Sequence, residues 1–522
     1  MAQKETSSKS RRWLGLSGAA VLVANLVLTG TTIAFQQEGE VNHALGIEGG
    51  DASYGGTEFS ADGTLSDASY EKYIEAAYQF CEQEEEEGSV LLYNRNNALP
   101  LSESERNVTV FGRGSIDPVF RSTAGGSSTN PDYQKTPVDA LQDAGFNVNQ
   151  TVLDAYASAD APKERSVSSV GEYDPALFTG SVTDSFASYG DVAFVTLSRF
   201  ATEGNDLAMV NDKGKRMLEL DDNEKAIFQK IKDSGKFKKT VVLLNSVFAM
   251  EMDWLDEYNV DAVLWVGNPG FYGMPGAIRV VTGEVNPSGH TTATFAANSL
   301  SAPSAENFGL HAYNYGSKTP RAAGDSFVSY NEGIYVGYRY FETFAKDCVL
   351  YPFGYGLSYT TFTRTVESFD FDGETVTEKV TVKNTGDVQG KEVVTVFVEA
   401  PQGKLGKAVR SLAAFAKTET LQPGESETLT LTFPIANLAS YDDNGVTGHR
   451  FCYVLESGAY NVYTGGCVRG AKLSGSFEVK EDTVTRTCVQ ACAPVTKFDR
   501  MVNHNNTIAF EPAPQREYDM AA

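Results

Sequence analysis

Short runs of consecutive apolar residues alternate with segments of helical periodicity through the first half of the chain. The apolar runs are VTVFG (108–112), DVAFVTL (191–197), TVVLLN (240–245) and VDAVLWVG (260–267). Between two of them, LDDNEKAIFQKIKDSG (220–235) places apolar residues three and four positions apart, as an amphipathic helix does. Continuous apolar runs are typical of parallel strands that are buried on both faces. The pattern therefore predicts an α/β fold, an αβα sandwich with a mostly parallel sheet, over residues 69–370.

The pattern changes from about residue 375, where apolar and polar residues begin to alternate with a period of two. TEKVTVKNTGDVQGKEVVTVFVEAP (377–401) predicts a strand, a turn and a second strand, and ETLQPGESETLTLTFPI (419–435) and SGAYNVYTGG (457–466) continue the alternation. Several short strands at regular spacing predict an all-β sandwich of immunoglobulin type over residues 371–480. Residues 481–522 show no core of their own, and we expect a tail or linker there.

The N-terminus carries a basic segment followed by an apolar one. Lys9, Arg11 and Arg12 precede a stretch without charge, residues 13–35, that is long enough to span a bilayer core. Residues 1–36 are therefore expected to be a membrane anchor, with a cleavable signal that ends at a small-x-small site as the alternative. Residues 37–68, rich in Gly, Ser and Asp, are expected to be a linker. Either alternative predicts that the rest of the chain is exported, on the extracellular side of a membrane or secreted.

Charge and cysteine content narrow the classes of function. The formal net charge of −25 disfavours nucleic acid as a partner, because no basic stripe is present to neutralise phosphates. Export would place the six cysteines where disulfides can form, and Cys452 with Cys467, or Cys488 with Cys492, are candidate pairs. No zinc-ligand spacing, G-x-G-x-x-G or G-K-[ST] motif is found, so we expect no metal and no cofactor.

Candidate chemistry lies in loops that follow predicted strands. In open α/β sheets, ligands bind beyond the carboxyl ends of the strands. SRFATEGNDLA (198–208) follows one apolar run directly and contains Glu203, while RGS (113–115) and STAGGSST (122–129) follow another. The residues alone leave two alternatives open for Glu203, namely a catalytic acid and a polar residue at the end of a buried strand.

Five segments together resemble a known family. They are SVLLYNRNNALPL (89–101), SRFATEGND (198–206), NPGFYGMPGAIRVVTGEVNPSGHTTATF (268–295), YNEGIYVGYRYF (330–341) and YPFGYGLSYTTF (351–362). In this order they resemble the second domain of family three glycoside hydrolases, the β-glucosidase group. The strand run from 376 to about 475 resembles the fibronectin type III-like module that follows that domain. The resemblance covers roughly residues 70–475.

The resemblance implies a site shared between two domains. In the family a (β/α)8 barrel supplies an aspartate nucleophile, and the αβα sandwich supplies a glutamate acid/base in a loop of the form G-E-G-x-D. The segment TEGND aligns with that loop, which implies that Glu203 is the proton donor and that Asp206 holds the loop or touches sugar. Ser127 and Ser128, in the loop after the first apolar run, are candidates for lining the sugar cleft.

The barrel itself has no counterpart in this sequence. Eight βα repeats need about 200–250 residues, and the family's barrel motifs are missing. We therefore expect the barrel in a continuation or in another chain, with a β-linked oligosaccharide or glucoside as substrate. The leading hypothesis is an exported β-glycosidase, β-glucosidase-like, in which this chain supplies the acid/base half of the site. The alternative is a non-catalytic surface module that binds glycan or a protein partner.

Overall fold

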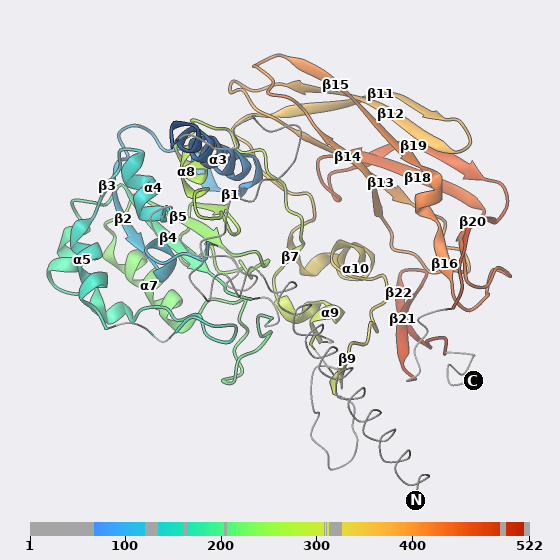
Figure 1. Cartoon of the computed structure of the whole chain (residues 1–522), viewed down its shortest axis with the longest axis horizontal. Helices are drawn as coiled ribbons and strands as arrows, with labels where there is room; N and C mark the ends of the chain where they lie inside the picture. Colours follow the sequence, from blue (N-terminus) through green and yellow to red (C-terminus); the bar gives the residue numbers. More distant parts are fainter. Residues whose placement is uncertain are drawn as a thin grey trace, which may run out of the picture. The chain divides into compact units, whose positions relative to one another are not determined.

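Figure 1 shows the computed structural model of the 522-residue chain. The structure describes residues 67–120, 134–160, 162, 164–202, 206–306, 308–309, 311–312, 326–490 and 497–515. The expected anchor, 1–36, and nearly all of the expected linker lie outside these residues. Within the described part of the chain, no helix combines the length and the apolar character that crossing a membrane requires. The chain divides into two units, Met1–Ile74 and Glu75–Ala522, and the second contains nearly all of the predicted α/β domain and the whole of the predicted β-sandwich.

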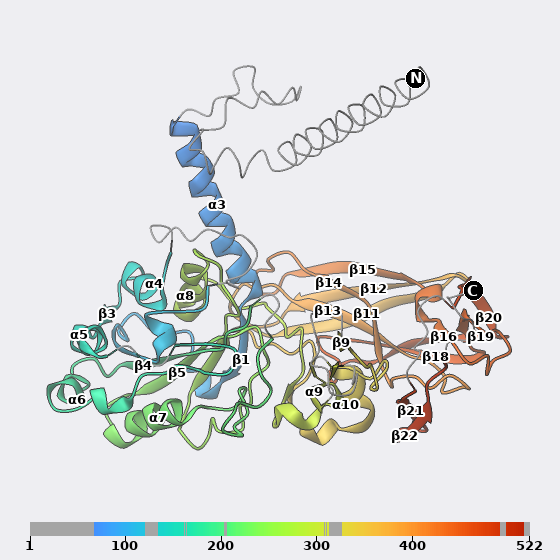
Figure 2. The ribbon, with the colours of Figure 1, turned by 60° about the horizontal axis from the view of Figure 1, so that its bottom comes forward.

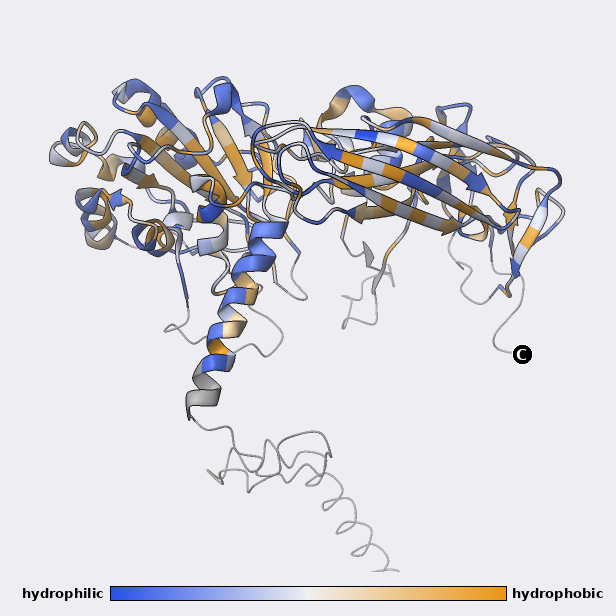
Figure 3. Ribbon diagram, turned by 90° about the horizontal axis from the view of Figure 1, so that it is seen from above, coloured by the Kyte–Doolittle hydropathy of each residue, from blue (hydrophilic) through white to orange (hydrophobic). Residues whose placement is uncertain are grey.

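A six-stranded sheet with the strand order β1-β6-β5-β4-β2-β3 forms the centre of the first domain. Neighbours from β6 to β3 pair in parallel, and β1 runs antiparallel to β6 at the edge. The strands are strongly hydrophobic in Figure 3, as expected for a sheet covered on both faces. They span β1 (Val90–Asn94), β2 (Asn107–Phe111), β3 (Asn147–Val148), β4 (Val192–Ser198), β5 (Lys239–Asn245) and β6 (Ala262–Trp265).

Helices cover both faces of this sheet, as Figure 2 shows, with α4 and α8 on one side and α7 on the other. Alternate residues of β4 enter two separate cores, Val195 the core beneath α7 and Phe194 the core beneath α8. This arrangement confirms the predicted αβα sandwich. The helices are α3 (Asp67–Gly88), α4 (Pro137–Asp143), α5 (Gln150–Ser158), α6 (Ser181–Ser185), α7 (Asp222–Ser234), α8 (Met274–Thr282), α9 (Pro303–Glu306) and α10 (Tyr338–Phe344).

Helix α7 shows why the sequence folds as it does. Asp221 caps its first turn, and a reciprocal hydrogen bond from the backbone of Asp221 to Glu224 completes a capping box. Gly235 ends the helix in the left-handed conformation at φ 56°, which favours glycine. The helix predicted over 220–235 is thus present, and both its N-cap and its C-cap residue adopt the conformations expected at helix ends.

The second domain is a β-sandwich, as predicted. Along β12 (Thr375–Asn384) every second residue is buried, and its buried valines help to fill the core between the two main sheets. Short strands complete the region between the domains: β7 (Phe295–Ala296), β8 (His311–Ala312), β9 (Ser326–Phe327) and β10 (Val349–Tyr351). The sandwich strands are β11 (Phe362–Phe371), β12 (Thr375–Asn384), β13 (Val393–Glu399), β14 (Ser411–Lys417), β15 (Ser426–Pro434), β16 (Ser440–Asp442), β17 (Cys452–Leu455), β18 (Gly458–Gly465) and β19 (Lys472–Val479).

The segment after residue 480 differs from the expected tail. Strand β20 (Thr483–Thr487) pairs with β17, and β21 (Asp499–His504) forms a hairpin with β22 (Thr507–Pro512). Met501 of β21 packs in a small core with Tyr335 and Ala408. The described part of this segment is therefore folded against the rest of the chain instead of forming a linker.

No disulfide forms between the cysteines that the structure describes. Cys452, Cys467 and Cys488 are free, as are Cys81 and Cys348. The candidate pair Cys452 and Cys467 is therefore not formed, and Cys488 is free among the described residues, while its candidate partner Cys492 lies outside them. Cys452 instead lies buried on β17 opposite Thr487 of β20, where it packs like a small apolar side chain.

Candidate functional site at the carboxyl edge of the sheet

A buried asparagine ties together the loops that leave the carboxyl ends of the strands. Asn245, the last residue of β5, accepts a hydrogen bond from Ser198 Oγ at 2.8 Å and from the amide of Val119 at 2.6 Å. Its amide group donates to the carbonyls of Val119 and Gly267, at 2.9 and 2.7 Å. One side chain thus holds the segments that follow β2, β4 and β6 at the same edge.

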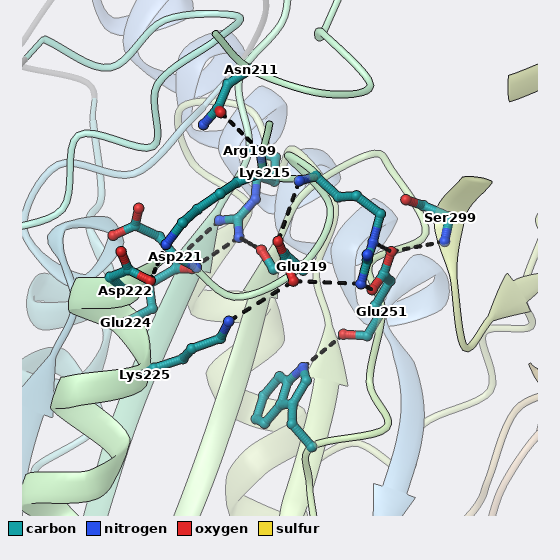
Figure 4. Close-up of polar contacts among 12 residues, drawn as sticks. Arg199, Asn211, Lys215, Glu219, Asp221, Asp222, Glu224, Lys225, Glu251 and Ser299 are labelled. Atoms are coloured by element: carbon teal, nitrogen blue, oxygen red, sulfur yellow. Dashed lines mark hydrogen bonds and ion pairs between the residues drawn. The ribbon is translucent and has the colours of Figure 1, made fainter. Parts of the chain in front are cut away.

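Arg199 is the first residue after β4, and it anchors the loop that follows (Figure 4). Its Nη1 and Nη2 pair with the carboxylate of Glu224 at 2.8 and 2.9 Å. The remaining donors reach the carbonyls of Met217 (2.5 Å), Ser198 (2.9 Å) and Glu219 (2.7 Å). Both partners of this ion pair are buried, with side chains 0% and 1% exposed. Every N–H group of the guanidinium is therefore satisfied, as a buried charge requires.

A second ion pair fastens the far part of the same loop. Arg216 binds Glu251 through Nε and Nη2, at 2.8 and 2.9 Å, and Glu251 also accepts from the amide of Ser299 at 2.8 Å. Burial by itself would raise the pKa of Glu251, but the hydrogen bonds from Arg216 and Ser299 outweigh it and hold that pKa below its usual value. Figure 4 shows Glu251 and Ser299 in the same view as Arg199 and Glu224.

The two flanks of the acid-bearing segment are thereby fixed. On one side stands Arg199, and on the other Leu207 is buried in the core at 3% exposure. The next residue, Ala208, donates its amide to Val167 at 2.8 Å, and a short hairpin joins Val210 to Arg216. The sequence between these flanks is the one that carries Glu203.

Of the four residues that the sequence assigns to the site, the structure describes one. Asp206 is exposed beside the buried Leu207. Glu203, Ser127 and Ser128 lie outside the described residues. The structure thus gives the framework of two strand-end loops, whereas the assigned roles of these four residues stay predictions.

Glu172 belongs to this edge and was missed in the sequence. Both of its carboxylate oxygens accept from the amide of Arg113, at 2.9 and 2.9 Å, so that it holds the turn that follows β2. Burial raises the pKa of Glu172 to about 7, a rise that the amide hydrogen bonds oppose and the nearby Glu224 charge assists. The residue also lines a cavity of about 310 Å³ between the 168–172 and 211–223 segments. No spacing or motif marks this glutamate in the sequence.

The other conspicuous motifs have packing roles in the structure. Asn286 of NPSG accepts from Ser358 Oγ and from the amide of Tyr359, each at 2.8 Å, and so fastens YPFGYGLSY to the end of α8. A Cβ on Gly356 would lie 2.2 Å from the carbonyl oxygen of Gly289. A side chain at this position would therefore force the two segments apart, at a cost in stability. Two further acids occur in conspicuous segments: Asp253 of EMDWL (251–255) is exposed, and Glu332 of YNEGIYVGYRYF is 7% exposed.

Two family models match the chain. Residues 89–359 match the glycosyl hydrolase family 3 C-terminal domain, and residues 392–467 match a fibronectin type III-like domain. The matches fall inside the ranges 69–370 and 371–480 that the sequence pattern predicts, with β1 at the start of the first match and β18 at the end of the second.

Bacterial proteins that are similar to this chain are named β-glucosidases. The β-glucosidase of Ruminococcus albus is 39% identical over 443 residues, which cover 84% of this chain and 44% of that protein. β-Glucosidase A of Butyrivibrio fibrisolvens is 32% identical over 481 residues, 83% of this chain and 54% of that protein. The crystal structure of a β-glucosidase from Paenibacillus barengoltzii superposes with a TM-score of 0.75 at 32% identity, over 85% of this chain and 49% of that one. The chain thus spans about half the length of the relatives it matches.

Proposed function

We propose, from the premise that this chain belongs to glycosyl hydrolase family 3, that it forms the acid/base half of a β-glucosidase site. Supporting this proposal, relatives that match more than four fifths of the chain are named β-glucosidases. A β-glucosidase from Thermotoga neapolitana, solved in complex with α-D-glucose, shares the fold with a TM-score of 0.65 at 32% identity. The substrate class that follows is a glucoside with a β-linked leaving group.

The chemistry of a retaining glycosidase explains why half of a site would be found here. One carboxylic acid protonates the leaving oxygen while a second carboxylate attacks the anomeric carbon, with the two groups about 5–5.5 Å apart. In our proposal Glu203 donates the proton and later removes one from the attacking water. The nucleophile comes from the barrel expected by resemblance, in a continuation or in another chain.

The neighbouring residues have supporting roles in this proposal. Asp206 holds the acid loop or contacts a sugar hydroxyl, and Ser127 and Ser128 line the cleft from the loop that follows β2. Glu203 needs a raised pKa to remain protonated until the leaving group accepts the proton. Burial beneath a partner domain and substrate would supply that rise, since desolvation disfavours the carboxylate.

The observation that carries the proposal is the anchoring of the Glu203 segment on both sides. Arg199 holds one end through a fully buried ion pair with Glu224, and Leu207 holds the other in the core. A general acid must lie within a few tenths of an ångström of its productive position. An anchored loop at the carboxyl edge of a central strand meets that need better than a free loop.

We also propose that the protein acts outside the cytoplasm, because basic residues precede the uncharged stretch 13–35. The N-terminal segment would either tether it to the membrane or direct its secretion.

The proposal is tested by replacing the acid in the active enzyme, with this chain and the barrel both present. Glu203→Gln should abolish hydrolysis of alkyl glucosides, which need protonation of the leaving oxygen, and should largely spare kcat/KM, which reports the first step, for aryl glucosides with acidic phenols. Its kcat on those aryl glucosides should fall, because the same side chain activates the water of the second step. Asp212→Asn, an exposed carboxylate in the same loop region, is the matched control and should leave both rates unchanged. Equal losses on the two substrates in Glu203→Gln would contradict the assigned role.

A further inference from the structure

We propose a second carbohydrate site, in the cavity that lies between the β-sandwich and the folded segment after residue 480. The cavity has a volume of about 470 Å³, within the range of small-molecule sites. The walls come from four parts of the chain, namely the 333–339 segment, the 398–412 segment, the 437–443 segment with β17, and β21. This site lies outside the carboxyl edge described above, and only the choice of a gluco-oligosaccharide as its ligand rests on the proposed function.

An aromatic row on one face of a small sheet forms a wall of this cavity. Tyr441 of β16 pairs directly with Tyr453 of β17, which pairs with Arg486 of β20. Directly paired residues of antiparallel strands project on the same face. The two tyrosine rings lie 5.2 Å apart, and the Arg486 guanidinium lies 5.9 Å from the Tyr453 ring. Tyr441 is 37% exposed, so part of its ring is free to contact a ligand.

The strand beneath this row is held rigidly. Asp442, the residue after Tyr441, points to the opposite face and is 0% exposed. Its carboxylate accepts from the amides of Gly445, Val446 and Thr447 at 2.6, 3.0 and 2.8 Å. The two tyrosines therefore lie on a hairpin that is already ordered, so that less conformational entropy is lost when a ligand binds.

The charged groups of the walls occur as opposite pairs. Arg500 of β21 binds both carboxylate oxygens of Asp443, and Lys407 binds Glu456 in the interior. The Asp443–Arg500 pair, with side chains 23% and 28% exposed, offers hydrogen-bond donors and acceptors without net charge, whereas the buried Lys407–Glu456 pair only keeps its part of the wall neutral. Arg339, which is exposed, adds one cation at the rim.

These features favour a neutral sugar over other small ligands. A pyranose presents C–H groups on its faces and hydroxyl groups around its edge, so one face can stack on a tyrosine ring while the edge meets paired charges. Aromatic walls with a few polar groups are the usual composition of such sites. A β-linked gluco-oligosaccharide is the natural member of this class to test, because the proposed catalytic site takes the same sugars.

Calorimetric titration of the full chain with cellotetraose at millimolar concentrations tests the site. We expect Tyr441→Ala to weaken binding at least tenfold, which corresponds to about 1.4 kcal/mol. Asn437→Trp, at an exposed position of the cavity wall, should block entry without disturbing the core, and it serves as a second variant if Tyr441→Ala folds poorly. Phe415→Ala removes an aromatic ring that is 70% exposed on β14 and does not line the cavity, so it should bind as the parent chain does.

The outcomes separate this site from the catalytic proposal. Absence of cellotetraose binding, or equal binding by the parent chain, Tyr441→Ala and Asn437→Trp, would overturn the inference. Loss of binding in Glu203→Gln but not in Tyr441→Ala would place the sugar at the proposed acid site and would also overturn it. Tighter binding of a uronic-acid oligosaccharide than of cellotetraose would reject the neutral class of ligand.

Discussion

Replacing Arg199 by methionine should destabilise the α/β domain strongly. The substitution keeps much of the side-chain volume but removes the charge that faces Glu224, whose side chain is 1% exposed. Removal of one partner from a buried ion pair typically costs about 3–5 kcal/mol, because the remaining charge stays without compensation. The carbonyls of Met217 and Glu219 lose their donors at the same time. We therefore expect the free energy of unfolding of this domain to fall by about 4 kcal/mol.

Tryptophan fluorescence during urea unfolding is a suitable assay. Two of the three tryptophans, Trp254 and Trp265, lie in the α/β domain, so the signal follows that domain even if the β-sandwich unfolds separately. Lys215→Met, which removes a partner of the exposed Asp222 in the same loop region, is the matched control and should leave the transition unchanged.

A double-mutant cycle completes this test. Arg199→Met combined with Glu224→Leu removes both charges, so the double variant should be more stable than Arg199→Met alone. If Arg199→Met shifts the transition no further than Lys215→Met, the buried pair does not anchor the loop, and the reasoning from its burial is refuted.

Two further stability predictions follow from Glu172 and Gly356. Burial raises the pKa of Glu172 from 4.5 to about 7, so between these values the folded state holds a proton that the unfolded state has released. Its contribution to stability is therefore complete below pH 4.5 and falls by roughly 3 kcal/mol as the pH rises to 7. In urea unfolding at a series of pH values, Glu172→Gln should remove this part of the pH dependence of the free energy of unfolding. An unchanged pH dependence would contradict the assignment. Gly356→Ala should lower the thermal midpoint of unfolding, because its Cβ would lie 2.2 Å from the Gly289 carbonyl oxygen, a backbone clash worth about 1–3 kcal/mol. Gly88→Ala is the control and should leave the midpoint unchanged, since a Cβ there meets nothing within 4 Å.

The parts of the fold that could be predicted are those whose signals are local. The strands β2, β4 and β5 are continuous apolar runs, and α7 carries its own cap residues at both ends. Periodicity and capping act over a few residues, so a single sequence reveals them. The sheet and the sandwich follow from these elements once their order is known.

The parts that could not be predicted depend on contacts between distant residues. Arg199 and Glu224 are 25 positions apart in the sequence, and Glu172 and the amide of Arg113 are 59 positions apart. Strand β20, with Arg486, is polar and mostly exposed, and it is defined by its pairing with β17. No local pattern distinguishes such a strand from a linker. Strands β21 and β22 pair with each other instead, and the apolar residues on either side of Asn505 and Asn506 are a local hairpin signal that the expectation of a tail overlooked.

The pH dependence of glucoside hydrolysis tests the central claim most directly. For the active enzyme, with this chain and the barrel both present, kcat/KM should fall at high pH as the general acid loses its proton. In Glu203→Gln the side chain cannot ionise, so this alkaline decline should disappear for an activated aryl glucoside while the acidic decline, set by the nucleophile, remains. An alkaline decline that persists unchanged in Glu203→Gln would show that another group is the acid, and the assignment of Glu203 would then be wrong.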